Sequence, residues 1–326
     1  MRLFSKDEFT LGELVASPID KVPFLWERFI PQYGITFITG PSNCNKSTLL
    51  RQLAIEVASG NTEFLNQGLN THHSKVILVS TEDMSINIVP LVKKQIEDKD
   101  MQKIGKNIDF IFTAKNVINR IRGKLDKRRA DLVIFDAWTD LYHGNLNQSN
   151  EVRNSLEGLN DLVRDYGCAI VALHHERKGS EDKALSVDNM LGSTGIQAKS
   201  RSVFQMSRTS DSGRRLTPLK ANYNGPSKSN EKPCILLELD SESMNLRYAG
   251  EVGLSNNKPE KGYPKEVRNK LLLRILELNA AGDGNTKIAN KLKGEFPGEE
   301  TPSKNTIKSW IDEYGQSDKP IEELTD

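Results

Sequence analysis

The chain has 326 residues, with 45 lysines and arginines against 44 aspartates and glutamates, so its formal net charge of +1 names no partner. No stretch approaches the roughly 20 consecutive apolar residues of a membrane helix, which argues against a membrane protein or a membrane partner. Because the N-terminus lacks the apolar core of a secretory signal and Cys44, Cys168 and Cys234 have no metal-ligand spacing, we expect a cytoplasmic protein with reduced cysteines.

Apolar runs alternate with helical patterns from about residue 34 to residue 175. Short, nearly continuous apolar strands separated by helices are typical of a parallel sheet covered by helices on both faces. The predicted strands are ITFITG (35–40), KVILVSTED (75–83), IDFIFTA (108–114), ADLVIFDA (130–137) and CAIVALHH (168–175), and the predicted helices cover 46–59, 88–98, 117–125 and 152–166.

The pattern changes after residue 200. Short extended runs separated by turns, from Arg201 to Ala249, predict antiparallel strands added at one edge of the sheet. A polar stretch and three helical patterns at 267–282, 286–292 and 303–314 follow. We therefore predict an α/β domain over 1–250, a linker over 251–264 and a small helical domain with an acidic tail over 265–326.

The stretch GPSNCNKST (40–48) lies between the first of these strands and its helix. Gly40, Lys46 and Ser47 match the phosphate-loop pattern G-x-x-x-x-G-K-[ST], in which backbone N–H groups, a helix N-terminus and a lysine bind phosphate while the hydroxyl reaches Mg²⁺. Taken alone, the stretch could also be an ordinary strand-to-helix turn. The residues predicted to bind nucleotide are Gly40, Asn43, Cys44, Asn45, Lys46, Ser47 and Thr48.

Asn45 stands where the pattern has its second glycine. Asparagine is one of the few other residues that tolerate the left-handed backbone conformation, so the loop can still form. Its side chain, however, is expected to lie beside the phosphates, where it could crowd them or shift the lysine.

Polar residues also close the other predicted strands: Glu82 with Asp83, Asp136, and His174 with His175. The carboxyl ends of parallel strands share one edge of a sheet, where such sheets bind their ligands. There Asp136 could reach Mg²⁺ through water, and Glu82 could orient a water molecule as general base. Together with the loop, these strand ends predict a nucleotide site.

Four stretches resemble, in the same order, the ATPase core of RecA-like proteins, particularly the RepA-type hexameric helicases of plasmid replication. They are VPFLWERFIPQYGITFITGPSNCNKSTLLRQLAIEVASG, VILVSTED, LVIFDAWTDL and IVALHHERKG, and the resemblance covers about Phe24 to Tyr223. It implies a RecA-like parallel sheet sandwiched by helices, ATP and Mg²⁺ as ligands, a homo-oligomer of hexameric form, and single-stranded or duplex DNA as partner.

The resemblance also implies roles for individual residues. Lys46 would hold the β- and γ-phosphates, Ser47 and Asp136 would serve Mg²⁺, and Glu82 would be the catalytic base. His175, or else His174, would sense the γ-phosphate and relay its presence to a loop that faces DNA. Within the polar stretch 176–186, the candidates for DNA contact are Arg177, Lys178 and Lys183, with a mobile, solvated loop as the alternative.

The stretch LKANYNGP departs from the family pattern. It resembles a hairpin whose Lys-x-Arg pair reaches the γ-phosphate of a neighbouring subunit. Lys220 is present, but Asn222 replaces the arginine, so we expect slow hydrolysis. Another arginine could substitute, and the candidates are Arg201, Arg208, Arg214 and Arg215.

The helical patterns at 286–292 and 303–314 resemble a helix-turn-helix, whose second helix enters the DNA major groove. The expected DNA-facing residues are Ser303, Lys304, Asn305 and Lys308, and the expected inward residues are Ile307, Trp310 and Ile311. The segment 293–302 between the helices is longer than the usual turn. A helical domain for oligomerisation or packing is therefore the alternative.

The sequence thus predicts a DNA-dependent ATPase of the RecA/RepA-like helicase class, acting in replication or mobile-element maintenance. A nucleotide-gated DNA-binding regulator with slow or no hydrolysis is the second hypothesis. A scaffold with a degenerate phosphate loop is the third, and the two carboxylates Glu82 and Asp136 argue against it.

Overall fold

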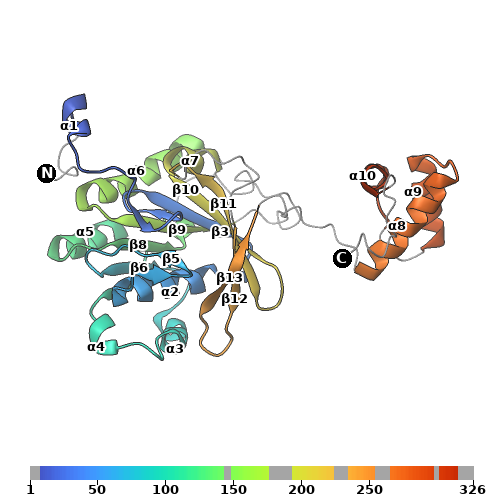
Figure 1. Cartoon of the computed structure of the whole chain (residues 1–326). Helices are drawn as coiled ribbons and strands as arrows, with labels where there is room; N and C mark the ends of the chain where they lie inside the picture. The colour runs from blue at the N-terminus through green and yellow to red at the C-terminus, as the bar shows by residue number, and fades with distance from the viewer. Residues whose placement is uncertain are drawn as a thin grey trace. The chain divides into compact units, whose positions relative to one another are not determined.

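The computed structural model of the chain describes residues 8–142, 148–175, 193–223, 234–253, 265–296 and 301–314. The chain divides into two compact units, Met1–Asn256 and Asn257–Asp326. The first contains the sheet and the second contains helices (Figure 1). Among the described helices, none has the length and apolar character required to cross a membrane.

Within the described residues, the central sheet has nine strands in the order β13-β12-β11-β10-β3-β9-β8-β6-β7. The strands are β3 (Ile35–Gly40), β6 (Val76–Ser80), β7 (Ile108–Ile111), β8 (Leu132–Asp136), β9 (Ala169–His175), β10 (Ser202–Arg208), β11 (Gly213–Ala221), β12 (Cys234–Leu239) and β13 (Leu246–Val252). Two small hairpins are formed by β1 (Phe24–Trp26) with β2 (Ile30–Pro31) and by β4 (Glu63–Phe64) with β5 (Gln67–Gly68).

The helices of the first unit are α1 (Leu11–Val15), α2 (Lys46–Ser59), α3 (Ser85–Gln95), α4 (Met101–Ile104), α5 (Val117–Lys127), α6 (Ser149–Tyr166) and α7 (Ser193–Lys199), with a 3-10 turn η1 (Trp138–Leu141). Those of the second unit are α8 (Lys265–Ala280), α9 (Asn285–Glu295) and α10 (Lys304–Tyr314). The predicted helix at 46–59 coincides with α2.

Apolar side chains alternate between the two faces of the sheet, because successive residues of a strand point to opposite sides. In β3, Ile38 packs into the core beneath α2, whereas Ile35 and Phe37 pack into the core that α5, α6 and α7 cover. Figure 1 shows α2 and α5 on opposite sides of the sheet. The predicted α/β architecture, a parallel sheet between helical layers with antiparallel edge strands, is confirmed.

One strand differs from the prediction. Residues 202–208 were expected to begin the antiparallel part of the sheet, but β10 pairs in parallel with β3, and antiparallel pairing begins only at β11. Helix α7 lies between β9 and β10 in the chain. A connection that includes a helix is long enough for the crossover that parallel neighbours require, whereas the short hairpin after β10 returns the chain antiparallel.

The second unit has its own core. Its three helices enclose buried apolar side chains, among them Leu271, Ile288 and Leu292. Ile307 and Trp310 of α10 are buried in this core and Ile311 packs against it, as the sequence predicted. In the first unit, β13 continues to Val252, two residues into the segment assigned to the linker.

Gly40 ends β3 in a place where only glycine fits. Its φ is +147°, and an added Cβ would lie 2.1 Å from the backbone carbonyl oxygen of Met206 on β10. The absence of a side chain therefore allows β10 to lie close against the start of the loop that follows β3.

We expect Gly40→Ala to lower the free energy of unfolding by about 3 kcal/mol or more, because strain and overpacking add at this site. Urea denaturation measures the change. Gly123→Ala is the matched control: it lies within α5 with nothing near its Cβ position, so it should stabilise the protein by about 0.5–1 kcal/mol. Equal stabilities for wild type and Gly40→Ala would contradict the close approach of β10.

Candidate active site

A cavity of about 360 Å³ lies where the carboxyl ends of β3, β6, β8 and β9 meet. It combines the residues that follow β3 with polar side chains from the other three strands. Its lining is Ser42, Asn43, Asn45, Lys46, Ser47, Thr48, Glu82, Asp136, Leu173 and His175. Most of the predicted nucleotide-binding, catalytic and metal-binding residues therefore lie together.

The phosphate loop (Gly40–Thr48) leads directly into α2, so the free N–H groups of that helix point toward the cavity. Lys46 is 7% exposed, and its Nζ donates to the carbonyl oxygens of Gly40 at 2.9 Å and Pro41 at 2.7 Å. Cys44 is buried, and its Sγ donates to the Pro41 carbonyl oxygen. Lys46 thus hydrogen-bonds the backbone of its own loop. A bound anion could accept these hydrogen bonds in place of the two carbonyl oxygens.

Asn45 adopts the left-handed conformation, with φ 68° and ψ 30°, as the cap of α2. Its side chain does not cap the helix. Instead, its Oδ1 accepts a hydrogen bond of 2.8 Å from Nε of Arg214 on β11, and its Nδ2 lies 3.5 Å from Oγ1 of Thr48. The sequence anticipated the backbone conformation but not the contact with Arg214, which joins residues 169 positions apart.

Ser47 and Asp136 lie side by side in the cavity lining, and Ser47 Oγ donates to Asp136 Oδ1 at 3.1 Å. Burial raises the pKa of Asp136 to about 6, and the hydrogen bond from Ser47 opposes the shift. A hydroxyl beside a buried carboxylate fits Mg²⁺, which prefers oxygen ligands and takes others from phosphate. Among the described residues, no three acidic, histidine or cysteine side chains are grouped closely enough to hold a metal ion.

Glu82 and His175 form a pair at the mouth of the cavity, with His175 Nε2 2.5 Å from Glu82 Oε1. This hydrogen bond lowers the pKa of Glu82 and raises that of His175. Each partner therefore favours the charged form of the other. The adjacent His174 is fully buried against the rings of Phe37 and Trp138, and of the two histidines only His175 lines the cavity.

Arg51 is a buried residue of α2 that contacts Thr48 of the phosphate loop, and it was not among the predicted site residues. It is 4% exposed; its Nη2 donates to Thr48 Oγ1 at 3.4 Å and its Nε to Gln95 Oε1 at 3.2 Å. Burial lowers its pKa, while its charge in turn favours ionised Asp136. The sequence contained one indication of this role: Arg51 comes four residues after Ser47, so both lie on the same face of the helix.

Lys220 does not belong to the cavity. On β11 it lies opposite Val203, near the start of β10, whereas the phosphate-loop end of the hairpin pairs Arg208 with Arg214. Its Nζ donates to the carbonyl oxygen of Ser200. If Lys220 contacts a nucleotide, that nucleotide would therefore have to be bound to another molecule of the protein.

Only some of the predicted DNA-binding residues belong to the part of the chain that the structure describes. Lys304 and Lys308 are exposed on α10 of the second unit. The side chain of Asn305, and the residues Arg177, Lys178 and Lys183, lie outside the described part of the chain.

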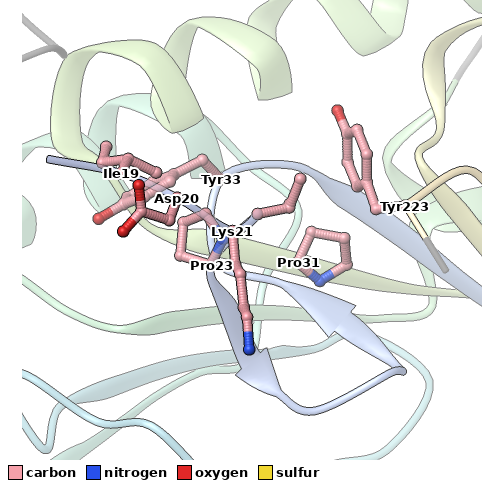
Figure 2. A pocket seen from close by; sticks show the side chains of 8 residues that line it. Ile19, Asp20, Lys21, Pro23, Pro31, Tyr33 and Tyr223 are labelled. Carbon is pink, nitrogen blue, oxygen red and sulfur yellow. The ribbon is translucent and has the colours of Figure 1, made fainter. Parts of the chain in front are cut away.

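A second cavity, of about 400 Å³, lies beside the segment that leads into β1. Tyr33 and Tyr223 lie on two sides of it, with Pro23 and Pro31 between them and Lys21 in front (Figure 2). Tyr33 precedes β3 and Tyr223 follows β11, so this cavity lies at the opposite edge of the sheet from the phosphate loop. None of its lining residues was predicted as a site residue.

Comparison with known proteins agrees with this geometry. Residues 5–181, more than half of the chain, match the family described as AAA domain. Over 201 residues the chain is 27% identical to the DNA repair and recombination protein RadB of Methanobrevibacter smithii, covering 57% of this chain and 78% of that protein. It also resembles the solved ATPase domain of G40P, with a TM-score of 0.55, 14% identity, and coverage of 74% of this chain and 96% of that one.

The raised pKa of Asp136 predicts a pH-dependent stability. The folded chain binds this proton more tightly than the unfolded chain, so stability is lost as the pH rises from about 4 to about 6. Without nucleotide at pH 8, Asp136→Asn should melt about 3 °C or more above wild type, because the amide removes a buried charge. The difference should disappear below about pH 4.

Melting curves followed by circular dichroism from about pH 3 to about pH 8 measure this effect. Asp98→Asn, an exposed carboxylate, is the control and should leave the melting temperature unchanged. A lower melting temperature for Asp136→Asn at pH 8 would contradict a carboxylate destabilised by burial.

Proposed function

Because the chain belongs to the AAA domain family, we propose that it is a Mg²⁺-dependent ATPase that couples ATP binding and hydrolysis to action on DNA. One observation carries the ATPase proposal: the phosphate loop, the Ser47–Asp136 pair and Glu82 line one cavity. Each part has a distinct task in phosphoryl transfer, namely holding phosphate, holding the metal and directing water.

ATP would enter with its phosphates against the N-terminus of α2. Lys46 would exchange its bonds to the Gly40 and Pro41 carbonyls for bonds to phosphate oxygens. Because these carbonyls are neutral and the phosphates are anionic, the new hydrogen bonds are the stronger ones. The lysine would thus neutralise charge that builds up during transfer.

Ser47 and Asp136 would hold Mg²⁺, with the serine as a direct ligand and the aspartate acting directly or through water. Bound Mg²⁺ supplies positive charge to the phosphate oxygens. Asp136 must be ionised for this task, and Arg51 favours that form.

Glu82 would accept the proton of the attacking water. Its bond to His175 keeps it ionised before ATP binds. When the γ-phosphate arrives, His175, which lines the same cavity, would exchange its bond with Glu82 for one with phosphate. This exchange would leave Glu82 ionised and free to accept a proton from water. It would also make the position of His175 depend on bound nucleotide, which could signal to the chain that follows β9.

Coupling to DNA rests on relatives. RadB is named for DNA repair and recombination, and the chain is 27% identical to it. We propose single-stranded or duplex DNA as the partner and a homo-oligomer of hexameric form as the assembly. In such an assembly Lys220, whose Nζ donates to the Ser200 carbonyl oxygen here, would exchange that bond for one with the nucleotide of a neighbour.

A nucleotide-gated DNA-binding regulator is the second candidate. The observation that favours it is the second unit, a helical bundle whose α10 exposes Lys304 and Lys308 while burying Ile307 and Trp310. Such a helix could lie in a DNA groove, as the second helix of a helix-turn-helix does.

We expect Glu82→Gln to lower the ATP turnover by about 100-fold or more, because it removes a general base. It should leave binding of Mg²⁺–ATP almost unchanged, since no phosphate contact is lost. Turnover is measured as phosphate release and binding by calorimetry. Lys46→Ala is the comparison and should lose both. Undiminished turnover in Glu82→Gln would exclude this glutamate as the base.

We expect the double variant Lys304→Ala/Lys308→Ala to bind duplex DNA more weakly. The slope of the logarithm of the binding constant against the logarithm of the salt concentration should become shallower by about 2, one for each lost phosphate contact. Fluorescence anisotropy of the full chain at several salt concentrations measures both. Lys270→Ala/Lys293→Ala removes the same charge from other exposed positions of the second unit and should change neither. Equal effects of the two double variants would exclude α10 as the DNA-binding element.

A further inference from the structure

Arg214 is a buried arginine at the start of β11 that the proposed mechanism does not use. It is 4% exposed. Its Nη1 donates to the carbonyl oxygens of Ser210 at 3.2 Å, Asp211 at 3.2 Å and Gly213 at 2.7 Å. These bonds fix the guanidinium in the turn between β10 and β11, so that its Nε meets the phosphate loop at a set position.

The hairpin of β10 and β11 contacts both ends of the phosphate loop. At the first end, Gly40 lies so close to the carbonyl of Met206 on β10 that no side chain fits between them. At the second end, Arg214 Nε donates to Oδ1 of Asn45, the residue before Lys46. The loop is therefore held between two points of one hairpin.

A glycine in place of Asn45 would accept the left-handed conformation at lower strain, but it would offer Arg214 no acceptor. The asparagine combines both requirements, because it tolerates this conformation and carries an amide oxygen. Its bond to Arg214 draws that oxygen toward β11. An arginine–amide hydrogen bond in a buried setting is among the stronger neutral–charged contacts.

We propose that Arg214 is a positioning residue for nucleotide binding, which acts through Asn45 to hold the phosphate loop in its anion-binding conformation. The inference rests on the proposed ATP site. It treats Asn45 as the acceptor that replaces a loop glycine rather than as a defect of the loop. Arg214 contacts the loop and needs no contact with the nucleotide.

The test is a double-mutant cycle of Asn45→Gly, Arg214→Ala and the double variant. Binding of a fluorescent ATP analogue with Mg²⁺ is the readout, and the melting temperature without nucleotide is recorded in parallel. Each single variant should weaken binding about tenfold, as expected when one hydrogen bond to a charged donor is lost. The double variant should be no weaker than either single variant, because both remove the same contact. Arg247→Ala, an exposed arginine on β13, is the control and should bind as wild type does.

If Arg214→Ala fails to fold, the single variant Asn45→Gly still tests the proposal, because glycine tolerates the left-handed backbone conformation at this position. In Asn45→Gly, weaker binding with an unchanged or higher melting temperature supports positioning, since a purely structural role would lower both. Tighter binding by Asn45→Gly would overturn the proposal and mark the asparagine as a defect. Additive effects of the two substitutions would also overturn it. Wild-type protein that binds no analogue would instead contradict the proposed ATP site itself.

Discussion

The parallel pairing of β3 with β9, β9 with β8 and β8 with β6 is the constraint on which the candidate site depends. It brings the carboxyl ends of four strands to one edge of the sheet, where each contributes a different chemical group. The apolar residues of these strands are buried on both faces, so the strand ends cannot shift independently. A phosphate loop, a carboxylate beside a hydroxyl and a glutamate–histidine pair are thereby held around one small cavity.

Much of this arrangement follows from local patterns. Continuous apolar runs predicted the parallel strands, and the polar residues after them predicted which strand ends share the cavity. Glu82, Asp136 and His175 line it, whereas Asp83 and His174, expected beside them, do not. The bounds of α2 were predictable because Gly60 follows its last residue in a left-handed conformation that ends the helix. The left-handed conformation of Asn45 followed from the same steric argument.

Other features depend on tertiary contacts that no local pattern contains. The parallel direction of β10 is set by a crossover that includes α7, so a short extended run beside antiparallel strands was misassigned. The bond between Arg214 and Asn45 joins β11 to the loop across 169 positions, and the sequence offered four arginines without a means of choosing among them for a role at the site. Burial decided between His174 and His175, since adjacent residues of a strand point to opposite faces.

We infer that the cavity holds the triphosphate of ATP between the phosphate loop and Glu82. The decisive experiment is a structure of the chain determined with Mg²⁺ and a non-hydrolysable ATP analogue. We predict that Lys46 Nζ leaves the Gly40 and Pro41 carbonyls for phosphate oxygens, that Ser47 contacts the metal and that the γ-phosphate lies beside Glu82 and His175. An analogue bound elsewhere on the molecule, with Lys46 still bonded to those two carbonyls, would contradict it.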